Sequence, residues 1–140
     1  MTDLPAPGAF EVLERLRAAA IARSATDMGA VYAADAVHEF PFAPPGVPSR
    51  MEGREVIMEF VTAFWAGSPL RYERYRTIAV HRTDDPGTIV VEQEVAGTST
   101  TTGAFVLPNV MVLTVRDGVI GHVRDYANPL AVQRATGSPG

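Results

Sequence analysis

The spacing of apolar residues predicts helices in the first half of the chain and strands in the second. Over residues 9–23, apolar side chains recur at intervals of three and four, the pattern of a helix with one buried face. A shorter helix is expected over about residues 27–35. A third is expected over 54–66, where a glycine–serine–proline sequence follows and ends it.

After residue 69 the apolar period changes from 3.6 to 2, which is typical of strands. Four strands are expected, over residues 71–82, 88–96, 104–115 and 119–127. Turn sequences rich in aspartate and glycine separate neighbouring strands, so antiparallel hairpins are predicted. An earlier strand is expected over 37–42, followed by a loop at the proline-rich residues 43–49.

The order of these elements predicts an α+β fold. Helix, helix, strand and helix precede four antiparallel strands, so helices and strands do not alternate as they do in a doubly wound sheet. Three helices packed on one face of a curved, mainly antiparallel sheet would enclose a cone-shaped cavity. The 140 residues are expected to form one domain over 9–135, with a disordered lead-in at 1–8 and a loose tail at 136–140.

Composition and charge exclude several kinds of chemistry. The chain has no cysteine and no lysine, which excludes thiolate metal sites, a cysteine nucleophile and a Schiff-base lysine. A formal net charge of −4 argues against nucleic-acid binding, and no apolar run is long enough to span a membrane. No phosphate loop or metal-ligating histidine spacing is present, so neither a cofactor nor a metal is expected. The first residues lack a signal-peptide pattern, and a cytoplasmic location is expected.

Four stretches carry a family resemblance: YAADAVHEFPF at 32–42, MEGREVIMEF at 51–60, FVLPNVMVLTV at 105–115 and VRDGVIGHVRDYANPLAV at 115–132. With the element order, they resemble the nuclear-transport-factor-2-like (NTF2-like) superfamily, most closely its SnoaL-like polyketide cyclase and ketosteroid isomerase-like branch. The resemblance covers about residues 10–132 and implies a cone-shaped, cystatin-like α+β barrel. The string DY-x-NP near its end resembles the phenazine-biosynthesis A/B-type proteins.

The resemblance implies one acidic catalytic residue. In SnoaL-like cyclases and phenazine-type proteins an acid in the last strand moves the proton, and Asp125 has this place. Ketosteroid isomerases have polar catalytic groups at the positions of Leu16, Phe40 and Met111, all apolar here, which argues against their mechanism. Limonene epoxide hydrolases need an Arg-x-Asp pair where this chain has Glu-Gln-Glu at 92–94, so only their last-strand aspartate is matched.

The strand pattern suggests His38 as a second candidate catalytic residue beside Asp125. His38 shares a strand face with Phe40 and Phe42, where its imidazole would face the ligand and exchange a proton with Asp125. The structural alternatives are a histidine satisfied within the core and an aspartate in a salt bridge at the sheet edge. The expected ligand-binding residues are aromatic, aliphatic or amide side chains: Leu16, Tyr32, Phe40, Phe42, Phe60, Phe64, Gln93, Asn109, Met111, Leu113 and Val123.

Two classes of function stay open on this basis. The first is a cofactor-independent acid/base enzyme of natural-product metabolism, such as a cyclase, isomerase, dehydratase or related lyase, acting on a hydrophobic cyclic small molecule. An epoxide hydrolase-like activity is a further alternative. The second class is a non-catalytic module of the same fold, for ligand binding or assembly. A homodimer through the outer face of the sheet is expected, with Tyr72, Ile78 and Val80 as candidate contacts.

Overall fold

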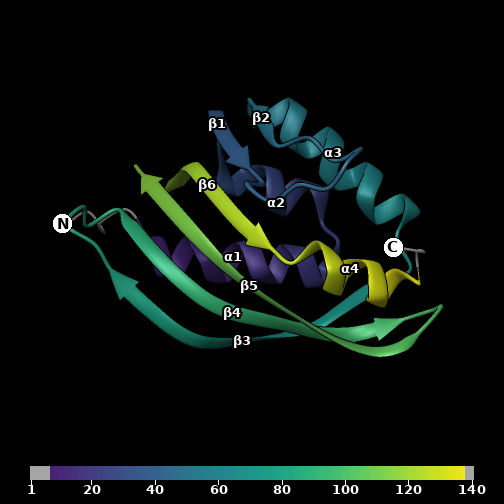
Figure 1. The fold of residues 1–140 in the computed structure, drawn as a ribbon. Helices are drawn as coiled ribbons and strands as arrows, with labels where there is room; N and C mark the ends of the chain where they lie inside the picture. The colour runs from purple at the N-terminus through teal and green to yellow at the C-terminus, as the bar shows by residue number, and fades with distance from the viewer. Residues whose placement is uncertain (1–6, 138–140) are drawn as a thin grey trace.

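The computed structural model describes residues 7–137, in which helices α1 and α3 lie on the concave side of one curved sheet (Figure 1). The helices are α1 (Ala9–Ala22), α2 (Ala25–Val31), α3 (Arg54–Gly67) and α4 (Pro129–Thr136). The strands are β1 (Tyr32–Glu39), β2 (Arg50–Glu52), β3 (Leu70–Arg82), β4 (Thr88–Ser99), β5 (Gly103–Arg116) and β6 (Val119–Ala127). The predicted α+β architecture is confirmed.

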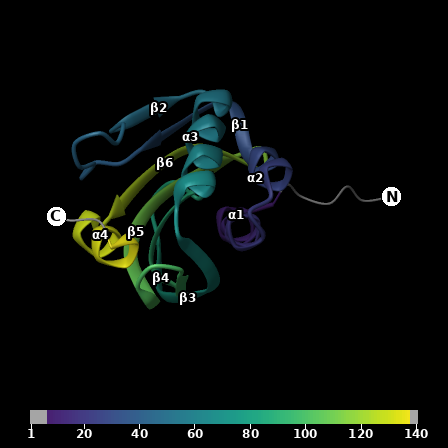
Figure 2. The same ribbon diagram turned by 90° about the vertical axis from the view of Figure 1, so that its right-hand side faces the viewer.

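The sheet is mainly antiparallel, with the strand order β2-β1-β6-β5-β4-β3. Strands β3 to β6 form the predicted antiparallel series. Strand β1 pairs in parallel with β6, which places His38 opposite Val123, two residues before Asp125. Figure 2 shows α1 and α3 on the same side of the curved sheet. Because β1 and β6 are neighbours, side chains from distant parts of the sequence lie close together on this side.

Local contacts fix where the first two helices end and begin. The Ser24 side chain caps α2 by accepting a hydrogen bond from the backbone N–H of Asp27. Helix α1 is followed by Arg23, whose backbone is left-handed with φ 53°. The Arg23 guanidinium donates to the carbonyl oxygen of Trp65 at 2.7 Å and to that of Leu70. These bonds tie the end of α1 to α3 and to the start of β3.

The core lies between α1 and the concave face of the sheet. The apolar face of α1, with Val12 and Leu13, packs into one cluster with Val91, Leu113 and Val123 of the strands, and each of the five is at most 1% exposed. Complete burial of a valine or leucine side chain contributes roughly 1.5–3 kcal/mol relative to exposure. This cluster holds α1 on the sheet and leaves the space beside it for a cavity.

A fourth helix, α4, follows the last strand, so the prediction of three helices was incomplete. Asn128 caps it by accepting hydrogen bonds from two backbone N–H groups of the first turn, Pro129 occupies its first position, and Gly137 ends it with φ 77°. All three are ordinary helix start and stop signals. The segment is too short for its apolar spacing to have predicted a helix.

Element boundaries also differ from the prediction around the first strand. Helix α2 ends at Val31 and β1 begins at Tyr32, so the strand predicted over 37–42 starts too late and extends too far. Strand β2 has three residues, too few to show a period, and was not predicted. Residues 1–6 of the expected lead-in and 138–140 of the expected tail lie outside the described residues.

A bulge in β3 turns two tyrosines to the same side of the sheet. Tyr72 pairs with Gly97, whereas the next paired residue, Arg74, pairs with Ala96, so one extra residue interrupts the alternation. Tyr72 and Tyr75 are three positions apart and would otherwise face opposite sides. Both instead lie on the concave side, where their rings meet edge to face with centroids 6.2 Å apart.

The bulge corrects one sequence-based assignment and explains one glycine. Strict alternation grouped Tyr72 with Ile78 and Val80 on the outer face. This is wrong for Tyr72 and also for Val80, because a second register shift, between Thr77 and Ala79, pairs Val80 with Val91 of the core. Ile78 lies within that shift and is 50% exposed. Opposite the bulge, a Cβ atom on Gly97 would lie 1.9 Å from the carbonyl oxygen of Arg71, so the close approach of the two strands requires glycine.

Candidate functional site

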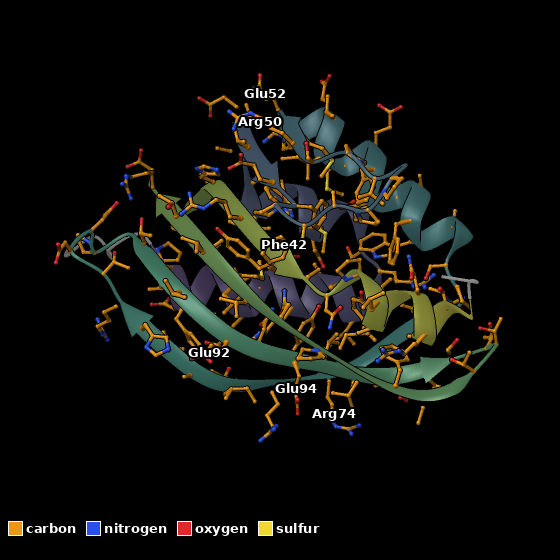
Figure 3. The ribbon with its side chains drawn as sticks, viewed as in Figure 1. Phe42, Arg50, Glu52, Arg74, Glu92 and Glu94 are labelled. Carbon is orange, nitrogen blue, oxygen red and sulfur yellow. The ribbon has the colours of Figure 1, made fainter. Side chains whose placement is uncertain are left out.

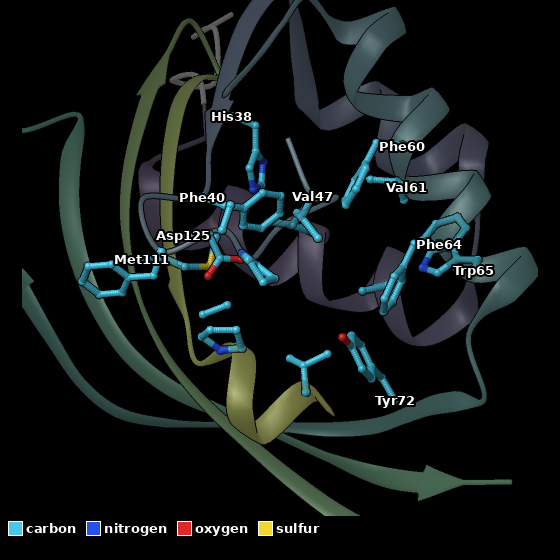
Figure 4. A pocket seen from close by; sticks show the side chains of 18 of the residues that line it. His38, Phe40, Val47, Phe60, Val61, Phe64, Trp65, Tyr72, Met111 and Asp125 are labelled. Atoms are coloured by element: carbon cyan, nitrogen blue, oxygen red, sulfur yellow. The ribbon is translucent and has the colours of Figure 1, made fainter. Parts of the chain in front are cut away.

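A cavity of about 470 Å³ lies between the helices and the concave face of the sheet (Figure 4). This volume is within the range of small-molecule binding sites. Its walls are mostly aromatic and aliphatic, and the Phe40 and Phe60 rings pack with centroids 5.7 Å apart. Nine of the residues predicted for the site line it: Leu16, Tyr32, His38, Phe40, Phe42, Phe60, Phe64, Met111 and Asp125.

The loop after β1 and helix α4 border the cavity. Phe42 and Val47 line it from the loop, and Val132 lines it from α4. Phe42 is 62% exposed, which marks the side where the cavity meets solvent, and its ring packs edge-on against Tyr126 at 5.5 Å. The helix that sequence analysis missed therefore contributes directly to the site.

Asp125 presents a carboxyl group to this apolar cavity. It lies on β6 opposite Met111 of β5, and the Nδ2 atom of Asn109 donates to its Oδ1 at 2.7 Å. No described residue donates to Oδ2. Burial raises the pKa of Asp125 to about 6, although the hydrogen bond from Asn109 opposes the rise. A carboxyl group with this pKa can both accept and release a proton near neutral pH.

His38 lies in the same cavity as a neutral imidazole, because burial lowers its pKa to about 4. Its Nδ1 shares a hydrogen bond with the Tyr32 hydroxyl at 3.2 Å, and its Nε2 is buried with no partner in residues 7–137. The Phe40 ring packs against the imidazole with centroids 4.8 Å apart. The pairing expected between His38 and Asp125 is not formed directly, since His38 bonds to Tyr32 and Asp125 to Asn109.

Three of the other residues predicted to bind ligand do not line the cavity. Leu113 and Val123 point to the concave side, but both are completely buried in the core that α1 covers. Asn109 holds the Asp125 carboxyl group instead of facing a ligand. Alternation along a strand identifies the face of a side chain, whereas the position of α1 decides whether that face meets core or cavity.

Gln93, the fourth such residue, is also drawn into internal contacts. Its Oε1 accepts hydrogen bonds from Nε and Nη2 of Arg17 at 3.0 and 2.7 Å. Its Nε2 lies 3.2 Å from the sulfur atom of Met111. Gln93 is 4% exposed and therefore supports the cavity wall from behind.

Sequence reasoning missed three aromatic residues of the lining, Trp65, Tyr72 and Tyr75. Trp65 lies on α3 next to Phe64 and lines the cavity with it. The two tyrosines face the cavity together because of the bulge in β3, and no local signal in the sequence predicted this bulge. Burial raises the pKa of both tyrosines, that of Tyr72 to about 12, and the nearby Asp125 charge adds to the effect.

The outer face of the sheet holds the charged residues of β4. Glu92 pairs with His81 at 2.6 Å and Glu94 with Arg76 at 2.7 Å. Figure 3 shows Glu92 and Glu94 pointing away from the helices, so the strand gives the cavity no charged pair of the epoxide hydrolase kind. Across residues 7–137, no three metal-ligating side chains group together, and no helix is long and apolar enough to cross a membrane.

Comparison with known proteins places the chain in a family. It matches the SnoaL-like domain family over residues 13–123. The uncharacterized protein YesE of Bacillus subtilis (strain 168) is 30% identical over 130 residues, which cover 92% of this chain and 87% of that protein. An uncharacterized PhzA/B-like protein of Pseudomonas aeruginosa is 36% identical over 108 residues, which cover 74% and 72% of the two proteins. The chain belongs to the SnoaL-like domain family.

The structural comparison agrees with this assignment. The crystal structure of a proposed isomerase from Bacillus subtilis superposes with a TM-score of 0.85 at 30% identity and covers 94% of each chain. The resemblance to the SnoaL-like branch of the NTF2-like superfamily is therefore confirmed. Because one fold of this kind hosts many activities, the reaction has to be argued from the site itself.

Proposed function

We propose that the protein is a cofactor-independent acid/base enzyme that acts on a hydrophobic cyclic small molecule. One observation carries the proposal: the Asp125 carboxyl group sits in an apolar cavity, anchored through Oδ1 by Asn109 and with Oδ2 unbonded to any described residue. The burial that raises its pKa suits it to move a proton near neutral pH. The similarity to a proposed isomerase supports the same kind of chemistry.

The reaction that this arrangement supports best is proton transfer at a carbon atom next to a carbonyl group. The Asp125 carboxylate takes the proton, the C–H electron pair forms a carbon–carbon double bond, and the carbonyl oxygen takes up the negative charge. Return of the proton to a different carbon gives an isomer, and attack of the carbon nucleophile on a second carbonyl gives a ring. His38 stays uncharged because burial lowers its pKa, so its part would be to hold Tyr32 by a hydrogen bond and not to exchange a proton.

Hydrogen–deuterium exchange into 2-tetralone tests this proposal. This bicyclic ketone has acidic hydrogens between its carbonyl group and its aromatic ring. Wild-type protein in deuterated buffer is expected to accelerate their exchange, measured by proton NMR. Asp125→Asn keeps the shape and the contact with Asn109 but removes the base, so the exchange rate should fall roughly 100-fold or more.

Asp35→Asn is the matched control, because Asp35 is an exposed aspartate of β1 outside the cavity lining. It should exchange the ketone as the wild type does. Undiminished exchange in Asp125→Asn would remove Asp125 from the mechanism, and a wild-type rate no greater than that of buffer would contradict an enzyme of this kind.

A non-catalytic binding module is the second candidate, and one observation favours it. Leu16, Phe40 and Met111 all line the cavity as apolar groups, so these positions offer a ligand contact area without reactive groups. Native mass spectrometry of freshly purified protein would show a retained hydrophobic compound. Retention without catalysed exchange would favour binding, and retention with exchange would favour the enzyme.

We also propose that the outer face of the sheet joins a second copy of the chain. Val106 of β5 lies on this face, because it alternates with the buried Phe105 and Leu107, and it is 52% exposed. The neighbouring strands add exposed side chains, among them Ile78 of β3 at 50%. They stand among charged residues such as Arg74, which Figure 3 shows on the convex side. A mixed apolar and charged sheet face of this kind suits contact with another protein surface.

A further inference from the structure

The inner side of β3 carries two hydroxyl groups that form no hydrogen bond with any described residue. Tyr72 and Tyr75 line the cavity, and neither hydroxyl is hydrogen-bonded to any residue in the range 7–137. Both hydroxyl oxygens also keep some accessible surface. Among residues 7–137, Nε2 of His38 is the side-chain polar atom that is fully buried without a partner, and neither tyrosine oxygen is in that state. Both residues border the cavity, and Figure 4 shows the Tyr72 hydroxyl pointing into it.

The backbone is built to bring both tyrosines to this wall. The interruption between Tyr72 and Arg74 places Tyr72 and Tyr75 on one side of the sheet, and Gly97 leaves room for it. A bulge interrupts the regular pairing of two strands and often changes the direction of a side chain beside a functional site. Here the result is a pair of phenolic donors on the β3 side of a mostly apolar cavity.

A positive charge lies behind one of these donors. The Arg17 guanidinium is 5.5 Å from the centroid of the Tyr75 ring, and two hydrogen bonds to Gln93 hold it there. Arg17 forms no salt bridge with any residue that the structure describes. Its charge therefore favours negative charge on an oxygen atom that is bound at the Tyr75 hydroxyl.

We propose that Tyr72 and Tyr75 donate the hydrogen bonds that hold a carbonyl oxygen of the ligand, so the substrate is a hydrophobic cyclic carbonyl compound. This inference rests on the proposed function, because it supplies the donors for the oxygen that becomes negative when Asp125 takes a proton from the neighbouring carbon. The C–H electron pair turns the existing carbon–carbon single bond into a double bond, and the former carbonyl π electrons stay on the oxygen held by the phenols.

The tyrosines suit this task better than His38, another neutral group that lines the cavity. Burial and the Asp125 charge raise the pKa of Tyr72 and Tyr75, so both keep their protons at neutral pH. The imidazole of His38 also has an unpartnered nitrogen, but this atom is sealed beneath the packing that includes Phe40. A ligand oxygen can reach the phenols without moving that packing.

Binding of two matched probes tests the inference without relying on turnover. 2-Tetralone has the carbonyl group and tetralin, its hydrocarbon counterpart, lacks it. Wild-type protein should bind the ketone more tightly than tetralin. Tyr72→Phe and Tyr75→Phe should each reduce this preference roughly 2- to 10-fold while leaving tetralin affinity unchanged. Tyr126→Phe is the control, because it removes a phenol outside the cavity lining.

The carbonyl stretching frequency of bound 2-tetralone is the second measurement. Hydrogen bonding lowers this frequency, so it should lie below its value in hexane for the wild type and rise towards that value in the double variant. An unchanged frequency and an unchanged ketone preference in the double variant would overturn the inference. If the frequency rises in His38→Phe but not in the tyrosine variants, the imidazole holds the carbonyl oxygen, and the inference would also be overturned.

The two proposals fail in different ways. If Asp125→Asn exchanges the ketone at the wild-type rate but the tyrosine variants lose their ketone preference, the proposed base is wrong and the donors stand. If the exchange depends on Asp125 but the preference is unaffected by the tyrosines, the donors are wrong and the base stands.

Discussion

At the scale of single residues, the contact between Asn109 and Asp125 shapes the site. The family resemblance selected Asp125, and a salt bridge at the sheet edge was the structural alternative. Neither could show that Asn109, expected to bind ligand, instead donates a hydrogen bond of 2.7 Å to Oδ1 of Asp125. Because this hydrogen bond only partly offsets burial, the pKa of the carboxyl group stays raised, to about 6.

The raised pKa of Asp125 predicts a stability that depends on pH. Between about pH 4 and pH 6 the folded protein keeps a proton that the unfolded chain releases, so the free energy of unfolding falls as the pH rises. The loss should amount to about 3 kcal/mol or less and be complete above about pH 6. Asp125→Asn should remove it, which makes the variant more stable than the wild type at pH 7 but not at pH 4.

Urea unfolding from pH 4 to pH 7.5 measures this difference. Asp35→Asn, the exposed control, should follow the wild-type curve. Parallel curves for the wild type and Asp125→Asn would show that the carboxyl group is not destabilised by its environment. In the exchange assay, the wild-type rate should rise with pH through about pH 6, because the carboxylate form of Asp125 is the base.

At the scale of elements, β3 and α4 decide what surrounds the carboxyl group. The strand was predicted within one residue at its start, yet its bulge reversed the expected side of Tyr72. Helix α4 had complete capping signals in Asn128, Pro129 and Gly137, and these signals alone could have predicted it. The bulge had no such local signal, since it follows from the approach of Arg71 to Gly97 across two strands.

Gly97→Ala tests the link between the bulge and the cavity. A methyl group at this position would meet the Arg71 carbonyl oxygen, so the variant should lose roughly 1–3 kcal/mol of unfolding free energy. If the strands separate to admit it, Tyr72 moves and the preference for 2-tetralone over tetralin should weaken. Gly67→Ala, where an added Cβ meets nothing within 4 Å, should change neither measurement. An unaltered Gly97→Ala protein would show that the bulge tolerates a side chain.

At the scale of the whole molecule, the sheet has two faces with different roles. The concave face carries the core and the cavity, while the convex face carries ion pairs and exposed apolar residues such as Val106. The helices cover one face only, as Figures 1 and 2 show. The proposed dimer would cover part of the other face with a second copy.

Val106→Glu tests the proposed dimer. Sedimentation velocity is expected to show a dimer for the wild type and a monomer for this variant, because the contact would have to bury an unpaired carboxylate. Val56→Glu places the same charge on an exposed position of α3 and should remain dimeric. A monomeric wild type, or a Val106→Glu variant that still dimerises, would contradict contact through this face.

The sequence by itself determined the class of fold and selected the carboxyl group that we propose as the base. Apolar spacing is a local property, so it predicted α1, α3 and the strands β3 to β6, and the family strings pointed to Asp125. The absence of cysteine and lysine left carboxylates, imidazoles, amides and hydroxyls as the available chemistry. None of these inferences required knowing how distant segments pack.

Tertiary structure decided which inward side chains meet the cavity. Leu113 and Val123 share the inward face of the sheet with Met111 and Asp125, yet α1 covers the first pair and leaves the second pair at the cavity. Tyr72 turns inward because of strand packing at Gly97, some 25 positions further along the chain. Local patterns fix the side of an element that a residue occupies, whereas contacts between elements distant in sequence fix what that side faces.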